Sequence, residues 1–140
     1  MEIKIVQNNQ ELQDAFSVRK QVFIHEQHVP EEIEIDEHDQ TAIHFVGYKQ
    51  DLPIAASRLR FVSEYGKLER ICVLKEERGK GYGKDIIQAM EQMITEKGYR
   101  KAKLNAQTHA EAFYQSIGYE TVSDPFIDAG IPHVTMIKTL

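Results

Sequence analysis

Apolar residues along the chain follow two spacings in turn. A helical period of about 3.6 residues marks residues 12–23 and 86–94, and a shorter segment with this spacing spans residues 111–117. Strand-like alternation or short β-branched runs fall at residues 2–7, 43–48, 54–62, 68–74, 101–106, 119–122 and 134–137. The resulting order, β-α-loop-β-β-β-α-β-α-β-β, predicts a mixed sheet with helices on its faces.

The segment between residues 26 and 40 breaks both patterns. It is rich in Glu and Asp and contains Pro30, which predicts a loop with room for one short helix. Gln50 to Pro53 predicts a hairpin turn, and Tyr65-Gly66 a second turn. No repeat, linker or low-complexity segment divides the chain, so we expect one domain over residues 1–140.

Composition limits function more than fold. Lys and Arg number 17 against 22 Asp and Glu, and the net charge of −5 disfavours a nucleic-acid surface and suits an amine-bearing partner. Cys72 is the single cysteine, so no internal disulfide can form. The N-terminus lacks the apolar core of a signal peptide, and no run approaches the roughly 20 apolar residues of a membrane span. We therefore expect a cytoplasmic protein with no membrane partner.

Three glycines at alternate positions, Gly79, Gly81 and Gly83, separate a predicted strand from a predicted helix. Because glycine has no Cβ atom, an anion can approach the main chain closely. The amides of the loop and of the helix N-terminus can then point to one position, with Arg78 and Lys84 adding positive charge. The segment predicts a phosphate or diphosphate site, although a surface turn that caps a helix would use the same residues.

The glycine spacing separates three kinds of phosphate loop. A Walker loop continues with Lys and a hydroxyl residue for magnesium, but here Gly83 is followed by Lys84-Asp85. The dinucleotide fingerprint Gly-x-Gly-x-x-Gly fails in both registers, because Lys84 or Ile86 stands where the third glycine is needed. What remains is Arg-x-x-Gly-x-Gly at Arg78, Gly81 and Gly83. This motif resembles the acyl-CoA diphosphate loop of the GNAT superfamily of N-acetyltransferases.

A second segment resembles the same family. Residues 104–107 and 112–119 are similar to its strand-plus-helix motif, which ends in Phe-Tyr-x-x-x-Gly followed by Phe or Tyr. The resemblance implies the GNAT fold, an α/β (α+β) mixed and mostly antiparallel sheet with helices on both faces. It also implies an N-acetyltransferase that uses acetyl-CoA as co-substrate and no metal.

The resemblance assigns roles to residues of both motifs. The backbone from Arg78 to Lys84 would hold the diphosphate, and the strand end at residues 71–73 would pair with pantetheine and polarise the thioester. Asn105 would hydrogen-bond the pantetheine arm, and Tyr114 would protonate the departing thiolate. Tyr114 could equally be a half-buried aromatic of an amphipathic helix. The expected cofactor-binding set is Ile71, Cys72, Val73, Arg78, Gly79, Lys80, Gly81, Tyr82, Gly83, Lys84, Asn105 and Tyr114.

The amine acceptor must lose a proton before it attacks, so a base is needed. Glu69 has the same parity as Ile71 and Val73 in the predicted strand, so it could point into the cleft as this base. It could equally form an ion pair with a neighbouring cation, Arg70, Lys67 or Arg58.

Other chemistries have weaker support in the sequence. Cys72 could act as an acyl-accepting nucleophile, but between two β-branched residues it is more typical of a small buried hydrophobe. His25 and His28 stand three residues apart, whereas a helical zinc site uses a spacing of four, so no metal site is predicted. His44, His109 and His133 are dispersed along the chain.

Two more stretches, residues 22–30 and 128–133, resemble the ElaA/YjcF-like branch of the family. We expect the acidic segment at residues 31–40 to border the acceptor site and to attract a cationic small molecule or a peptide amine. The predicted reaction is direct attack of a primary amine on acetyl-CoA. An acyl-CoA sensor without turnover, or a phosphate binder that uses the glycine loop alone, are the alternatives. The oligomeric state stays open, with a homodimer as one option.

Overall fold

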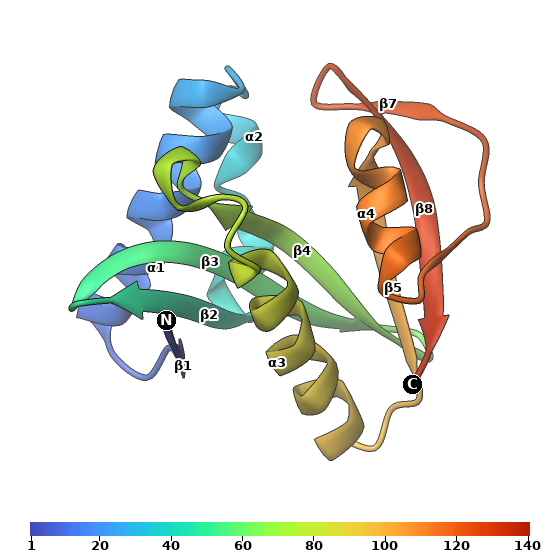
Figure 1. Ribbon diagram of the computed structural model, residues 1–140, viewed down its shortest axis with the longest axis horizontal. Helices are drawn as coiled ribbons and strands as arrows, with labels where there is room; N and C mark the ends of the chain where they lie inside the picture. Colours follow the sequence, from blue (N-terminus) through green and yellow to red (C-terminus); the bar gives the residue numbers. More distant parts are fainter.

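A mixed sheet of eight strands runs through the computed structural model, which describes residues 1–140 (Figure 1). The order across the sheet is β1-β2-β3-β4-β5-β8-β6, with β7 paired to β8. All pairings are antiparallel except that of β4 with β5. The strands are β1 (Glu2–Ile5), β2 (Ile43–Lys49), β3 (Leu52–Val62), β4 (Tyr65–Val73), β5 (Lys101–Gln107), β6 (Glu120–Thr121), β7 (Phe126–Asp128) and β8 (Ile131–Thr139). The predicted mixed sheet is confirmed, with β7 as an additional strand.

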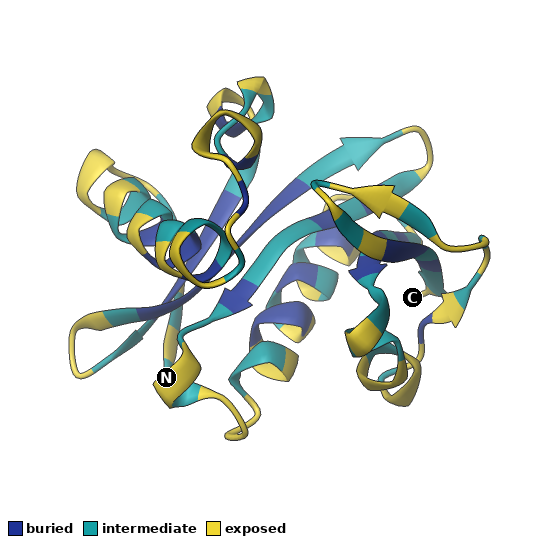
Figure 2. Ribbon diagram, turned by 90° about the horizontal axis from the view of Figure 1, so that it is seen from above, coloured by how far each residue is buried: buried dark blue, intermediate teal, exposed yellow.

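Two long helices cover opposite faces of this sheet (Figures 1 and 2). Helix α1 (Asn9–Arg19) continues into a π-helix, η1 (Lys20–Glu26), on one face. Helix α3 (Tyr82–Glu96) lies on the other. The remaining elements are short: α2 (Glu31–Glu34), η2 (Glu37–Gln40), η3 (Lys75–Glu77), η4 (Thr108–Ala110) and α4 (Glu111–Ser116). The acidic segment therefore folds as two short helices where one was expected.

The core has a large and a small half. Helix α3 buries Ile86, Ile87, Met90 and Ile94 in a cluster of 15 residues, as its helical spacing predicts. It packs directly on β4 at Gly66, where an added Cβ would lie 2.3 Å from Ile94. Helix α1 and η1 bury a smaller cluster of six residues on the opposite face. Figure 2 shows these buried positions where helices and strands face each other.

Strands β4 and β5 separate halfway along their length. Their parallel pairing begins at Tyr65 with Lys101 and ends at Leu68 with Leu104. Beyond Leu68 a β-bulge bends β4, because two of its residues, Arg70 and Ile71, face a single residue of β3. Arg70 adopts a left-handed backbone conformation with φ of 56°. Figure 1 shows the two strands diverging from the end near the C-terminus, which opens a gap in the middle of the sheet.

Candidate active site

A cavity of about 610 Å³ lies where β4 and β5 diverge. The glycine loop between η3 and α3 lines one end, and residues 33–34 and 67–70 line the other. Strand β5, helix α4 and β7 contribute the opposite wall. Every residue of the predicted cofactor-binding set lines this cavity except Lys80, whose ammonium group lies 2.8 Å from the Glu77 carboxylate. The fold thus brings both sequence motifs to one cavity.

The glycine loop presents a row of free amides. None of the backbone amides of residues 79–84 donates a hydrogen bond within the protein. Gly81 precedes α3 in a left-handed conformation with φ of 83°, and a Cβ added there would meet nothing within 4 Å. The unpaired amides and the positive end of the helix dipole therefore share one open position. An anion with several oxygens, such as a diphosphate, fits this arrangement.

Arg78, which was predicted to add positive charge at the diphosphate site, is paired with a carboxylate of the protein. Its guanidinium donates to both carboxylate oxygens of Glu26 on η1, at 2.6 and 2.7 Å, and its Nε donates to the Val73 carbonyl at 3.0 Å. Hydrogen bonds from Arg78 lower the pKa of Glu26 against the opposing effect of burial. In this structure Arg78 therefore closes the edge of the loop with an ion pair, and its charge is already paired.

The end of β4 offers backbone groups on its open edge. After Leu68 no strand pairs with β4 on the β5 side. Ile71 and Val73 pack toward the α3 face, and Cys72 packs into the small cluster on the α1 face. Burial raises the pKa of the Cys72 thiol to about 12, and its Sγ lies 3.7 Å from the Ala56 carbonyl. A buried thiol with a raised pKa argues against the nucleophile alternative.

Asn105 and Tyr114 lie on the opposite wall of the cavity. The Asn105 Oδ1 accepts a hydrogen bond from the Thr135 hydroxyl at 2.9 Å, which leaves its amide NH₂ group without a partner. The Tyr114 ring packs edge-on against Phe113 and Tyr119, and its hydroxyl makes no hydrogen bond within the protein. Burial raises the pKa of Tyr114 to about 12, with the nearby Cys72 as a second cause. Both side chains thus hold a free donor at the cavity.

Glu69 lines the cavity, but it does not share a face of β4 with Ile71 and Val73 as predicted. Leu68 belongs to the cluster on the α3 face, so strand alternation turns Glu69 toward the other face. The bulge at Arg70 then resets the alternation, and Ile71 and Val73 return to the α3 face. This change of face could not be predicted from the sequence, because no residue pattern here indicates that a bulge adds one residue to β4.

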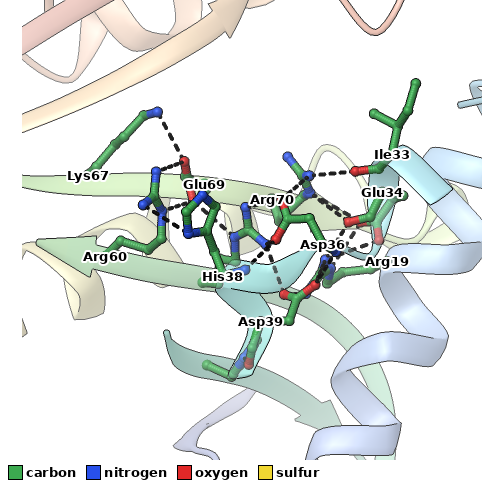
Figure 3. A network of polar contacts seen from close by, with 12 residues as sticks. Arg19, Ile33, Glu34, Asp36, His38, Asp39, Arg60, Lys67, Glu69 and Arg70 are labelled. Carbon is green, nitrogen blue, oxygen red and sulfur yellow. Dashed lines mark hydrogen bonds and ion pairs between the residues drawn. The ribbon is translucent and has the colours of Figure 1, made fainter. Parts of the chain in front are cut away.

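Glu69 forms ion pairs, which was the second prediction for this residue. Its carboxylate contacts Arg58 at 2.9 Å, Arg60 at 2.8 Å and Lys67 at 3.1 Å (Figure 3). Burial alone would raise its pKa, but the Arg60 hydrogen bond and the charges of Arg58 and Lys67 lower it to about 2. A carboxylate of such low pKa is a weak general base.

The acidic segment is neutralised from within the protein. Its buried carboxylates, Glu34 and Asp39, bond the fully buried guanidinium of Arg19 at 3.0 and 2.7 Å. Asp36 and Asp39 bond Arg58, at 2.6 and 2.9 Å (Figure 3). The expectation that this segment attracts a cation fails for these three carboxylates, because their charge is already matched by buried arginines.

His133 is a cavity residue whose importance the sequence analysis missed. It lies on β8, is 9% exposed and stacks on Phe126. Its Nδ1 lies 2.7 Å from the Ile131 carbonyl, and a carbonyl can only accept, so Nδ1 carries the hydrogen. In that tautomer Nε2 is the acceptor nitrogen, and it forms no hydrogen bond within the protein. Only the folded contact with Ile131 reveals this tautomer.

Comparisons with known proteins identify the family and the fold. The sequence model described as "Acetyltransferase (GNAT) domain" matches residues 6–140. The Bacillus subtilis protein named "Uncharacterized N-acetyltransferase YjcF" is 47% identical over 99% of each chain. The crystal structure of Escherichia coli ElaA superposes with a TM-score of 0.89 at 27% identity, over 99% of each chain. A GNAT family acetyltransferase from Elizabethkingia anophelis, solved with acetyl-CoA bound, shares the fold with a TM-score of 0.76 at 13% identity, over 99% of this chain and 97% of that one.

These likenesses confirm the predicted family, its ElaA/YjcF-like branch and the GNAT fold. Two proteins that share the fold, the Elizabethkingia anophelis acetyltransferase and an aminoglycoside 6'-N-acetyltransferase, were solved with acetyl-CoA and coenzyme A bound, respectively. No helix of the chain has both the length and the apolar character needed to cross a membrane. The roles of individual residues stay predictions.

Proposed function

Because the chain belongs to the GNAT acetyltransferase family, we propose that it transfers the acetyl group of acetyl-CoA to a primary amine by direct attack. The observation that supports this most is that the free amides of the glycine loop, at residues 79 and 81–84, and the open edge of β4 lie in one cavity. A surface turn that only caps a helix would not need that cavity. A phosphate binder that uses the loop alone would not need the open strand edge.

The glycine loop would hold the diphosphate, and the strand gap would hold the pantetheine arm. Amides of residues 79–84 donate to the phosphate oxygens, helped by the dipole of α3. The arm runs along the unpaired edge of β4 at residues 71–73, as an added strand does. Asn105 offers its free NH₂ group from the other side. This arrangement fixes the thioester beside the acceptor end of the cavity.

Acetyl-CoA supplies an activated thioester, whose carbonyl carbon bonds to the amine nitrogen while its C–S bond breaks. In our proposal the Nε2 of His133 accepts the proton of the amine, because it is the free, unprotonated nitrogen of a neutral ring. Tyr114 donates to the departing sulfur. Its pKa of about 12 keeps the hydroxyl protonated at neutral pH, so the donor is always present. Glu69 takes no part as a base.

Turnover is tested by mixing the protein with acetyl-CoA and a panel of amines and titrating the free thiol. We expect thiol release that depends on the amine, and CoA binding by calorimetry that exceeds binding of ATP or NAD. Binding without thiol release across a broad panel would favour the sensor alternative. A preference for ATP or NAD would contradict the assignment of the cavity to CoA.

Two substitutions test the proposed roles. Tyr114→Phe should leave CoA affinity unchanged and lower kcat about tenfold or more, as loss of one acid–base group does. His133→Gln should lower kcat similarly, because it removes the nitrogen that accepts the proton of the amine. Unchanged turnover in either variant would remove that residue from the mechanism. The unrelated exposed substitution Gln92→Ala is the control for both.

A further inference from the structure

The end of the cavity far from the glycine loop holds cations with spare hydrogen-bond donors. Arg70 bonds the Glu34 carbonyl, the Ile33 carbonyl and Asp36 only through Nε and Nη2, at 3.2 to 3.3 Å. Its Nη1 has no partner. Lys67 makes one contact, with Glu69 at 3.1 Å, although an ammonium group has three donors. Both side chains line the cavity and are 24% and 21% exposed.

The carboxylates at this end have no spare capacity. Glu34 is 1% exposed, and both of its oxygens accept from Arg19. Glu69 accepts from three cations. The ion pairs of this network join five cationic side chains, Arg19, Arg58, Arg60, Lys67 and Arg70, to only four carboxylates, Glu34, Asp36, Asp39 and Glu69. One positive charge is left over, within a protein whose net charge is −5.

Arg70 is the arginine of this network with the weakest ion pairs: its carboxylate contacts, with Asp36 at 3.3 Å and Glu34 at 3.5 Å, are longer than those of Arg19 and Arg58. Burial and the positive charges of Arg58 and Arg19 lower the pKa of Arg70 against the opposing effect of Glu34 and Asp36, whereas the hydrogen-bonded carboxylates around Arg58 raise the pKa of that residue. Arg70 also occupies the bulge of β4 with a positive φ of 56°, which is costly for a residue with a side chain. Bulges of this kind re-aim side chains beside functional sites. An anion arriving at Nη1 would supply the missing charge.

One carboxylate of the cavity wall stays unpaired. Asp128 on β7 is exposed and forms no ion pair. The opposite walls therefore offer a free carboxylate and free cationic donors. An acceptor with both a positive and a negative group matches these walls better than a simple cationic amine.

We propose that the acetyl acceptor carries a carboxylate as well as its amine, and that Arg70, assisted by Lys67, binds this carboxylate at the acceptor end of the cavity. The inference rests on the proposed acetyl transfer, and it replaces the purely cationic acceptor that the acidic segment suggests with one that carries both charges. Arginine suits this role because its planar guanidinium bonds carboxylate oxygens with charge-assisted hydrogen bonds.

The test compares amines that differ only in that group. β-Alanine with β-alaninamide, and glycylglycine with glycylglycinamide, are offered with acetyl-CoA while free thiol is measured. We expect kcat/KM to favour the carboxylate member of each pair by about tenfold or more, the usual effect of one charge-assisted hydrogen bond. Arg70→Gln should remove this preference, and Arg70→Lys should retain part of it. Arg60→Gln is the matched control, since Arg60 belongs to the network but does not line this cavity.

A second measurement does not depend on turnover. N-Acetyl-β-alanine and N-acetyl-β-alaninamide are titrated into the CoA-saturated protein by calorimetry. We expect the carboxylate to bind about tenfold more tightly in the wild type, and the two probes to bind equally in Arg70→Gln. If CoA binds but no amine releases thiol, the proposed function fails, and this titration still decides on the carboxylate site. Equal rates or affinities within the pairs, or a preference that survives in Arg70→Gln, would overturn the inference.

Discussion

The two ends of the cavity are built on opposite principles. At the glycine loop, six successive amides have no partner, and the space around Gly81 is open. At the far end, buried carboxylates and guanidinium groups satisfy one another, and the two cations that line this end of the cavity, Arg70 and Lys67, keep spare donors. The first end depends on a ligand to complete its hydrogen bonds. The ion pairs of the second end stabilise the fold and leave an excess of one positive charge. Charged residues that suggest a binding site in the sequence, such as those of the acidic segment, can therefore stabilise the fold instead.

The largest expected effect comes from removing Arg58, the centre of the ion network, which tests whether this end of the cavity stabilises the fold. Arg58 is 2% exposed and bonds Asp36, Asp39 and Glu69 at 2.6 to 2.9 Å. Arg58→Met should lower the free energy of unfolding by about 3–5 kcal/mol, because it leaves buried carboxylates without their partner. Urea denaturation followed by circular dichroism measures this loss.

An exposed ion pair provides the control for that experiment. Lys101 contacts Glu64 at 3.2 Å, with side chains that are 44% and 62% exposed. Lys101→Met should change the free energy of unfolding by less than about 1 kcal/mol. A comparable cost for both substitutions would show that burial of the network contributes nothing special to stability.

At the other end, a side chain placed in the anion position should affect binding and leave the fold intact. Gly81→Glu should weaken CoA binding more than about a hundredfold, since its carboxylate would occupy the position of the diphosphate and repel it. The positive φ of 83° should also cost about 1–2 kcal/mol of stability. Calorimetry with CoA and urea denaturation separate the two effects.

Gly98 offers a matched control for this substitution. It too has a positive φ, 87°, and open space where a Cβ would lie, but it ends α3 on the far side from the loop. Gly98→Glu should show the same cost in stability and normal CoA affinity. If both variants bind CoA normally, the amides of residues 79–84 are not the diphosphate site.

The network should also give the protein a measurable sensitivity to acid. The pKa of Glu69 falls from 4.5 to about 2 on folding, so its contribution is fully present above its ordinary pKa and is lost as pH falls toward 2. Wild type should therefore be more stable than Glu69→Gln at neutral pH. The gap should narrow by about 1–2 kcal/mol between about pH 5 and pH 3. Urea midpoints of both proteins across this range test it, and a constant gap would contradict the lowered pKa.

Local patterns allowed much of the fold and half of the site to be predicted. Helix α3 and the loop before it are encoded in consecutive residues, so spacing and glycine positions were enough to predict both. The short strand β7 was missed, because it has three residues and exposes Ile127. No alternation can be recognised over such a length.

The rest depended on contacts between distant residues. The carboxylates of the acidic segment accept hydrogen bonds from partners 15 to 34 residues away, in Arg19, Arg58 and Arg70. The bulge at Arg70 shifts the face of Glu69, and no glycine marks it. These distant partners are set by tertiary packing, which single-sequence patterns do not contain. The tautomer of His133 depends instead on a local contact, with the Ile131 carbonyl two residues earlier, whose geometry only the folded backbone defines.

The smallest expected effect concerns Arg78, which lies beside the free amides of the glycine loop but is itself held by an ion pair. Glu26 holds this guanidinium at 2.6 Å, in a pair whose side chains are 41% and 33% exposed. Removing the carboxylate frees Arg78 and takes a negative charge away from the diphosphate position. Glu26→Gln should therefore raise CoA affinity about two- to fivefold, since such exposed pairs contribute little, and the gain should shrink at high salt.

Glu31→Gln is the control, because Glu31 pairs with Lys20 at 3.7 Å outside the loop and should leave CoA affinity unchanged. A fall in affinity for Glu26→Gln would mean that Glu26 positions Arg78 for the diphosphate instead of competing with it. The glycine end would then also depend on an ion pair within the protein. The two ends of the cavity would differ only in how deeply their ion pairs are buried.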